Sequence, residues 1–271
     1  MDPRQAVKVS PRHVVTVDED YLALIARAPR QDFVVRTLAK RMAGDMPLMS
    51  GELVIAGQAT REEFPLAAAY PLHFRKTYYA GQLRGDPKGE FERHTRASEL
   101  IGIPPPIGFA GGTFRSCLVP GRPFHQLSAL GSEPEESNIK LADKLSLAAA
   151  SGLWLLAEQI YSTLTTLQQH GMTHGDAELH NFIVCSAPLE VIPIDFDMAV
   201  LRAGLSEEAW LEHCTRDLEP LLKIAVYLQC ALGAQAGLLG ELALSRIDAV
   251  VQRPAAFTRA IQDRLGLLAT L

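Results

Sequence analysis

Hydrophobic and polar positions follow two different patterns along the chain, and the change between them lies at the segment PGRPF, residues 120–124. Upstream, from residue 47 to residue 80, β-type residues are interrupted by Gly and Pro, which predicts two or three antiparallel strands. The last of these strands is expected near Leu72–Tyr79. Downstream of the break, hydrophobic residues recur mainly at helical spacing. The pattern therefore predicts a β-rich first part and a mostly helical second part.

The upstream part also contains one well-defined helix and a second pair of strands. The helix is expected over about Gly89–Ile101, because the prolines of GIPPP that follow cannot continue it. Residues 107–119 indicate two strands joined by a turn at Gly111 and Gly112.

The first 45 residues are predicted to be helical in two places. Residues 18–28 carry acids in their first turn, where negative charge favours the helix dipole. Over residues 31–44, Val34, Leu38 and Met42 lie on one face at helical spacing. We expect residues 1–45 to form an extension packed on or near the first lobe.

Helices and two short strands are predicted after the break. The helix over residues 152–171 is the best defined, because a leucine-rich stripe runs along it and Gly171 can end it. The other expected elements are helices over residues 137–151, 217–233 and 254–271 and strands in NFIVC and LEVIPIDF.

Together these elements predict an α+β fold with two lobes. Residues 46–116 would form a β-rich N-lobe, an antiparallel sheet with one main helix, and residues 117–121 a hinge. Residues 122–271 would form a mostly helical C-lobe. Clefts between lobes are where ligands usually bind, so we expect a site near the hinge.

Composition narrows the classes of partner. The 271 residues carry a net charge of −5 and 48% are hydrophobic, so the chain can bury a sizeable core. The acidic balance and the lack of a long Lys/Arg run argue against nucleic acid as a partner. No stretch approaches 18 uninterrupted apolar residues, so no membrane span is expected. The four cysteines form no CxxC pair, which favours free thiols and a cytoplasmic location.

The stretch HGDAELHN concentrates polar chemistry directly after the helix that Gly171 ends. His174, Asp176 and Asn181 have the spacing H-x-D-x-x-x-x-N, and Asp195 follows downstream in IDFD. Phosphoryl transfer needs one carboxylate to orient a hydroxyl and take its proton, and oxygen ligands that hold Mg²⁺ against phosphates. Asp and Asn supply such hard oxygen ligands.

On these residues the sequence resembles the protein-kinase-like superfamily, with HGDAELHN as the catalytic loop and IDFD as the metal-binding motif. The resemblance implies ATP and Mg²⁺ as cofactors. It also implies that Asp176 is the catalytic base, that Asn181 and Asp195 bind Mg²⁺, and that His174 is structural. The glycine of HGD is typical of the atypical and small-molecule branches.

The resemblance also implies a lysine on the third strand that holds the nucleotide phosphates and a helix glutamate that pairs with it. Lys76 in HFRKTYY is the candidate lysine, although a solvated strand lysine remains an alternative. Glu92 is the candidate glutamate. Glu99 is the second choice because it lies nearly two turns away on almost the same face, and Glu90 competes.

Further positions follow from the same resemblance. CLVPGRPF is similar to the hinge, so the backbone of Cys117, Leu118 and Val119 would bind adenine. Asp217 begins a predicted helix and would support the catalytic loop, although a simple N-cap explains it equally well. No G-x-G-x-x-G is present, so the phosphate cover is assigned to GQATRE, residues 57–62, with Thr60 near the phosphates.

Several alternatives stay open. Asp197 replaces the glycine of the D-F-G motif, and either contacts the metal or bonds the loop backbone. Glu178 and His180 occupy positions where kinase-like branches differ. A zinc cluster of His170, His174 and His180 is a further interpretation, but it lacks a fourth ligand at close spacing.

The acceptor of the phosphoryl group is not fixed by these motifs. The segment between Gly121 and His174 is short, and resembles the RIO group and related small atypical kinases, or lipopolysaccharide-core kinases, more than aminoglycoside phosphotransferases. A protein Ser/Thr acceptor is therefore favoured over a small molecule, sugar or lipopolysaccharide. A pseudokinase that binds nucleotide or a partner is the interpretation from a different class.

Overall fold

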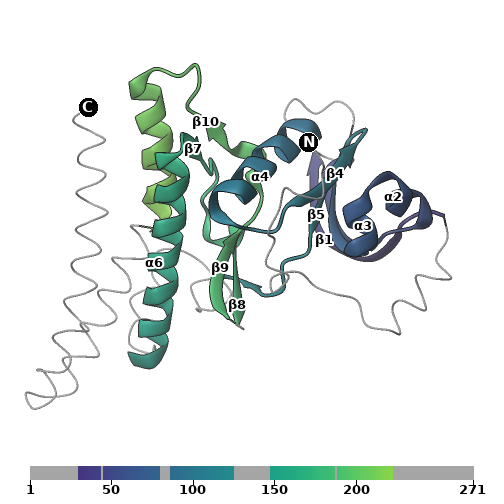
Figure 1. Ribbon diagram of the computed structural model, residues 1–271, viewed down its shortest axis with the longest axis horizontal. Helices are drawn as coiled ribbons and strands as arrows, with labels where there is room; N and C mark the ends of the chain where they lie inside the picture. The colour runs from purple at the N-terminus through teal and green to yellow at the C-terminus, as the bar shows by residue number, and fades with distance from the viewer. Residues whose placement is uncertain (1–29, 44, 80–85, 125–146, 187, 222–271) are drawn as a thin grey trace, which may run out of the picture. The chain divides into compact units, whose positions relative to one another are not determined.

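The computed structural model describes residues 30–43, 45–79, 86–124, 147–186 and 188–221 (Figure 1). These residues form a mixed α and β structure. The chain divides into two compact units between Pro120 and Gly121, inside the segment expected to be a hinge. Among the helices that the structure describes, none has both the length and the apolar character that a membrane span requires.

The first unit is built on a five-stranded antiparallel sheet with the order β1-β2-β3-β5-β4. Its strands are β1 (Phe33–Ala43), β2 (Met46–Ile55), β3 (Leu72–Tyr78), β4 (Pro106–Ala110) and β5 (Thr113–Cys117). The predicted third strand and the predicted pair after residue 106 are confirmed. Two short helices, α2 (Gln58–Glu63) and α3 (Pro65–Ala69), connect β2 to β3.

Helix α4 (Pro87–Ile101) packs against β4 and β5, and the helix predicted over Gly89–Ile101 is confirmed. The carboxylate of Asp86 caps its first turn by accepting the Gly89 N–H. Gly102 ends the helix in the left-handed conformation that glycine adopts without steric cost. Both signals are local, which is why the sequence located this helix well.

The helix predicted over residues 31–44 is wrong, because most of that segment is strand β1. The strand pairs along its length with β2, and its register shifts at three points, between Val34 and Arg36, Thr37 and Ala39, and Arg41 and Met42. Such bulges break the period-2 alternation that identifies strands in a sequence. The apolar side chains of β1 are also largely exposed, so their spacing carried no information about a buried face.

Residues 33–43 are thus part of the sheet. The predicted boundary at residue 46, between an extension packed on or near the N-lobe and the N-lobe itself, is therefore wrong for them. The helices predicted over residues 18–28 and 254–271 lie outside the described residues. The same holds for all but the last residues of 137–151 and for the part of 217–233 beyond Leu221.

The second unit centres on α6 (Leu147–Gln169), which confirms the helix predicted over residues 152–171 in its main part. A second helix covers residues 207–221. The short strands form two small sheets, with the orders β6-β8-β9 and β10-β7. The strands are β6 (Arg122–Pro123), β7 (Met172–Thr173), β8 (Phe182–Ser186), β9 (Leu189–Pro193) and β10 (Val200–Leu201).

The core of the second unit joins α6 and helix 207–221 to the sheet of β6, β8 and β9. Its largest buried side chains are Phe124, Leu156, Ile160, Leu164, Phe182, Val191, Trp210, Leu218 and Leu221. The side-chain amide of Gln168 also donates to the backbone carbonyl of Cys214, which ties α6 to helix 207–221. This core fixes the start of the 170–182 segment at the end of α6.

Helix 207–221 begins earlier than the sequence suggested. Ser206 caps it by accepting the Ala209 N–H, and Glu207 and Glu208 occupy its first turn, where acids favour the helix dipole. Asp217 therefore lies inside the helix, and the prediction that Asp217 begins a helix is wrong. The turns that precede Asp217 pack on the core through the buried side chains of Trp210 and Leu211.

A buried polar network lies on one face of β3. The carboxylate of Asp32 accepts from Arg75 at 3.1 Å and from Arg115 at 2.7 Å. Arg115 also donates to Nε2 of His73 at 3.0 Å. Because a guanidinium can only donate, His73 carries its proton on Nδ1 and gives it to the Pro71 carbonyl. His73 is therefore neutral in the folded protein.

This arrangement predicts an acid-sensitive stability. Burial and the charge of Arg115 lower the pKa of His73 to about 4, from the usual 6.5. Between these values the unfolded chain binds a proton that the folded protein does not. The His73 contribution to the free energy of unfolding should therefore decrease as the pH falls from 6.5 to 4, by up to about 3 kcal/mol. The raised pKa of Asp217 acts in the opposite direction over part of this window, so the effect of His73 is read from the difference between wild type and a His73 variant. Denaturant titrations at pH 7, 6, 5 and 4.5 measure it.

The control is His73→Gln, which keeps an acceptor for Arg115 and cannot titrate. The variant should show a flatter dependence of unfolding free energy on pH over this window. An equal slope in wild type and variant would contradict the assignment of the effect to His73.

Candidate functional site

Lys76 and Glu90 form a buried ion pair in the first unit. Nζ of Lys76, on β3, lies 3.3 Å from Oε1 of Glu90, in the first turn of α4. Their side chains are 5% and 1% exposed. Burying either charge alone costs several kcal/mol, so each requires the other. The pair holds an ammonium group at a fixed place on the α4 face of the sheet.

The structure thus gives Lys76 a different partner from the predicted Glu92. Two residues along a helix rotate a side chain by about 200°, so Glu90 and Glu92 point to nearly opposite sides. Glu92 is exposed and lies 3.7 Å from Lys88, and Glu99 is exposed as well. The buried side of α4 is instead marked by Glu90, His94, Ala97 and Ser98.

The second unit orders the HGDAELHN loop around His174. Its ring is fully buried, with ring centroids 5.7 Å from Phe182 and 4.7 Å from Phe196. Burial lowers the pKa of His174, so the ring is neutral. Nε2 lies 3.0 Å from the Ile194 carbonyl and therefore carries the proton. This bond joins the loop to the segment just before Asp195.

Asp217 holds the backbone of the same loop. Its carboxylate accepts the N–H of His174 at 2.6 Å and the N–H of Gly175 at 2.8 Å. Only 1% of the residue is exposed, and burial raises its pKa to about 6 although both N–H groups act in the opposite direction. The carboxylate thus fixes the two residues that precede Asp176.

Asn181 fixes the side chain of Asp176. Its Nδ2 donates to the Asp176 carbonyl at 2.9 Å and to Oδ2 of the Asp176 carboxylate at 3.0 Å. The short helix η4 (Leu179–Asn181) brings the two residues together. With its amide hydrogens used on Asp176, the carbonyl oxygen of Asn181 is the atom of this side chain suited to a cation.

Asp195 adopts a left-handed conformation, with φ 66° and ψ 69°. It is the one non-glycine residue with positive φ in the described part of the chain. For a residue with a Cβ this conformation is strained, and such strain concentrates at functional sites. The N–H of Ile194, the residue before Asp195, donates to the backbone carbonyl of Asn181. This bond ties the backbone before Asp195 to the loop.

Over the ranges that the structure describes, no three His, Cys, Asp or Glu side chains gather where they could hold a metal ion. The interpretation of the three loop histidines as a zinc cluster is thereby wrong. A Mg²⁺ site makes a smaller demand, because this ion commonly takes one or two carboxylates and completes its shell with water and phosphate oxygens. The oxygen donors of Asn181 and Asp195 fit that pattern.

The segment expected to bind adenine, residues 117–119, begins with the last residue of β5. Cys117 ends the strand and is buried, and burial raises the pKa of its thiol to about 12, so the thiol stays protonated. Leu118 and Val119 are half-buried and lie outside regular secondary structure. Their backbone groups form no strand pairing in the sheet.

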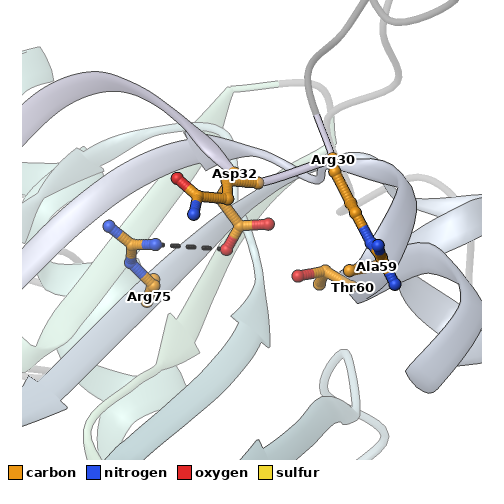
Figure 2. A pocket seen from close by; sticks show the side chains of 6 residues that line it. Arg30, Asp32, Ala59, Thr60 and Arg75 are labelled. Carbon is orange, nitrogen blue, oxygen red and sulfur yellow. Dashed lines mark hydrogen bonds and ion pairs between the residues drawn. The ribbon is translucent and has the colours of Figure 1, made fainter.

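Thr60 does not lie with Lys76. It belongs to α2 and lines a cavity of about 570 Å³ with Arg30, Gln31, Asp32, Ala59 and Arg75 (Figure 2). Successive residues of a strand point to opposite faces, so Arg75 and Lys76 leave β3 on different sides. The prediction that Thr60 covers nucleotide phosphates held by Lys76 is therefore wrong.

The Thr60 side chain forms a hydrogen bond with Asp32 instead. Burial alone would raise the pKa of Asp32, but the hydrogen bond from Thr60, the charge of Arg115 and the Gly57 N–H together lower it. Thr60 thus helps to keep this buried carboxylate ionised. The cavity contains a carboxylate that already has partners, which makes it a poor place for phosphate groups.

No sequence motif identifies Tyr78 or the partners of Asp32. Tyr78 follows Lys76 by two residues on a strand, so strand alternation places both on one face. Glu90 could have been predicted from the N-cap at Asp86. A cap fixes which residues occupy the first turn, and Glu90 is the acid in that turn. Asp32 and Arg115 lie far apart in the sequence, and no local signal joins them.

Comparison with known proteins adds no family to this geometry: the sequence matches no protein-family model and no curated protein.

The buried ion pair of Lys76 and Glu90 predicts that mutations at Glu90 and Glu92, two glutamates of α4, change stability by different amounts. Glu90→Gln should lower the free energy of unfolding by about 3 kcal/mol, because it leaves the Lys76 charge buried and unpaired. Glu92→Gln, the matched control, should change it by less than about 0.5 kcal/mol, because its ion pair is exposed. Denaturant unfolding followed by circular dichroism measures both. Equal effects would contradict the assignment of Glu90 as the partner.

The conformation and surroundings of Gly175 predict that the loop tolerates only glycine at this position. It has φ 81°, and a Cβ there would collide with the Met198 carbonyl. Gly204 has φ 84° with open space around it. Gly204→Ala should therefore cost only about 1 kcal/mol of unfolding free energy, from backbone strain. Gly175→Ala should cost about 3 kcal/mol or more, since strain and collision add. Similar losses in the two variants would show that the contact at Gly175 is unimportant.

Proposed function

We propose that the protein is an ATP- and Mg²⁺-dependent phosphotransferase of the protein-kinase-like superfamily that moves the γ-phosphoryl group of ATP to a hydroxyl acceptor. The observation that supports this most is the construction of the 174–181 loop. Asp217 fixes the loop backbone through two N–H groups, and the Asn181 amide fixes the Asp176 carboxylate. A base that is held from two sides can accept a proton without first becoming ordered.

In this proposal Asp176 orients the acceptor hydroxyl and takes its proton. The hydroxyl oxygen forms the new bond to the γ-phosphorus while the bond from that phosphorus to the β–γ bridging oxygen breaks, and ADP leaves. The carbonyl oxygen of Asn181 and the carboxylate of Asp195 hold Mg²⁺, which when bound neutralises charge on the phosphates. His174 is neutral and buried, and it acts only on structure. Its hydrogen bond to the backbone carbonyl of Ile194 holds the residue before Asp195 next to the loop.

Lys76 binds the nucleotide phosphates in the same proposal. Glu90 keeps the ammonium group in place and balances its charge while no nucleotide is bound. The backbone of Cys117, Leu118 and Val119 offers donors and acceptors for adenine. Asp195 of IDFD and the lysine–glutamate pair are the parts that phosphoryl transfer needs for positioning and electrostatic stabilisation.

For the acceptor, a Ser/Thr side chain of a protein is the favoured class. The support is the short chain between Gly121 and His174, which leaves little material for a dedicated small-molecule pocket. A sugar, lipopolysaccharide or other small molecule is the alternative. An acceptor panel with these classes separates them.

A pseudokinase that binds nucleotide or a partner without turnover is the second candidate. Two observations favour it: Asp197 takes the place of a glycine, and Thr60, assigned to the phosphates from the sequence, contacts Asp32 instead. The ordered Asp176 and Asn181 favour the active enzyme, because a protein without turnover has no need to hold a base in place.

The proposal predicts that Asp176→Asn lowers the rate of phosphoryl transfer by about 10²–10⁴-fold, the usual contribution of a positioned base. Asparagine keeps an oxygen for the Asn181 amide, so the loop should stay folded and the affinity for ATP should stay within a few-fold of wild type. The measurement is transfer of labelled γ-phosphate in the presence of Mg²⁺, with a panel of protein, sugar and lipid-linked acceptors.

Two outcomes decide between the candidates. If wild type binds ATP with Mg²⁺ but transfers no phosphate to any acceptor or water, the pseudokinase is favoured. If ATP with Mg²⁺ does not raise the thermal midpoint of wild type at all, the active enzyme and the nucleotide-binding pseudokinase are both excluded. The control is Asp195→Asn, which should weaken the dependence on Mg²⁺ while Asp176 remains intact.

A further inference from the structure

Tyr78 is a third member of the buried pair formed by Lys76 and Glu90. Its hydroxyl donates to Oε2 of Glu90 at 2.7 Å, while Oε1 of the same carboxylate faces Nζ of Lys76 at 3.3 Å. Each oxygen of Glu90 thus has a separate partner. Lys76 and Tyr78 are two residues apart on β3, so both side chains reach Glu90 from the same face of the sheet.

The hydroxyl restricts how the carboxylate can turn. With one oxygen held by Lys76 alone, a carboxylate can rotate about its terminal bond, since such torsions are broad. A second short bond at the other oxygen removes this freedom. The residue is only 1% exposed, so water does not readily replace the hydroxyl if it is lost.

The ring of Tyr78 acts on Lys76 directly. Nζ of Lys76 lies 5.2 Å from the ring centroid, within the range over which the face of an aromatic ring attracts a cation. Burial and the neighbouring charge of Glu90 raise the pKa of the Tyr78 hydroxyl, which therefore remains a proton donor at physiological pH. Tyr78 contacts both members of the pair while itself uncharged.

We propose that Tyr78 is a positioning residue for nucleotide binding: its hydroxyl orients Glu90, and through Glu90 it places the Lys76 ammonium group for the phosphates. This inference rests on the proposed function. It adds a residue that sequence motifs did not reveal, and it assigns Tyr78 an effect on phosphates rather than on adenine.

The test compares ATP with adenosine as ligands. In Tyr78→Phe the ring remains and only the hydroxyl is lost, so Lys76 loses its fixed position. The Kd for ATP with Mg²⁺ should rise by about 5- to 30-fold, while the Kd for adenosine stays within about twofold. A variant that merely loosens the fold would weaken both ligands alike. Isothermal titration calorimetry measures the two constants.

Tyr79→Phe is the matched control. Tyr79 is the next residue, and its hydroxyl lies 3.1 Å from Oγ of Ser50, away from the Lys76 pair. Its loss removes the same chemical group from a neighbouring position. Both Kd values should equal those of wild type.

A double-mutant comparison tests whether Tyr78 acts through Glu90. In a Glu90→Gln background, Tyr78→Phe should change the Kd for ATP by less than about twofold, because the carboxylate that Tyr78 orients is gone. The double variant lacks both the carboxylate and the hydroxyl that orients it, and circular dichroism checks its fold beside that of Glu90→Gln alone. A full 5- to 30-fold effect in this background would overturn the inference.

The outcomes separate this inference from the proposed function. Wild type that binds neither ATP nor adenosine would overturn the proposed function and the inference together. Wild type that binds ATP, combined with an unchanged ATP affinity in Tyr78→Phe, would overturn the inference alone. Equal losses for ATP and adenosine would assign Tyr78 to general stability and overturn the positioning role.

Discussion

Lys76, Glu90 and Asp217 are ionisable side chains that the fold buries to 4% exposure or less. A buried charge is costly unless it is paired or fully hydrogen-bonded, and this constraint fixes where the candidate functional side chains lie. In the first unit it joins the first turn of α4 to β3 through one ion pair, because Glu90 has to meet Lys76. In the second unit it sets the 174–181 loop against helix 207–221, because the Asp217 carboxylate has to find donors and finds two backbone N–H groups.

The parts that the sequence predicted correctly depend on local signals. Asp86, the prolines after Ile101 and Gly102 bound α4, and a leucine stripe with Gly171 bounds α6; each acts over one or two turns. The spacing of Asp176 and Asn181 is local as well, which is why a motif could identify the loop. The candidate residues of the second unit were therefore all available from the sequence.

The parts that the sequence missed depend on pairing between distant segments. Strand β1 owes its conformation to β2, and its bulges hide the strand period. The choice of Glu90 over Glu92 depends on which side of α4 faces the sheet, and α4 is too polar for hydrophobic spacing to show it. Thr60 was assigned to phosphates from its place in a short motif, whereas its contacts are set by Asp32, a residue from another segment.

The alternation of β3 places two separate polar networks on opposite faces of the strand. His73 and Arg75 point to one face, where Asp32 joins β3 to Arg115 of β5 and to the start of α2 at Gly57. Lys76 and Tyr78 point to the other face, toward Glu90. The first network thus ties β3 to β5 and α2, and the second ties the same strand to α4. Within the second network, Glu90 and Tyr78 together set the position of one ammonium group.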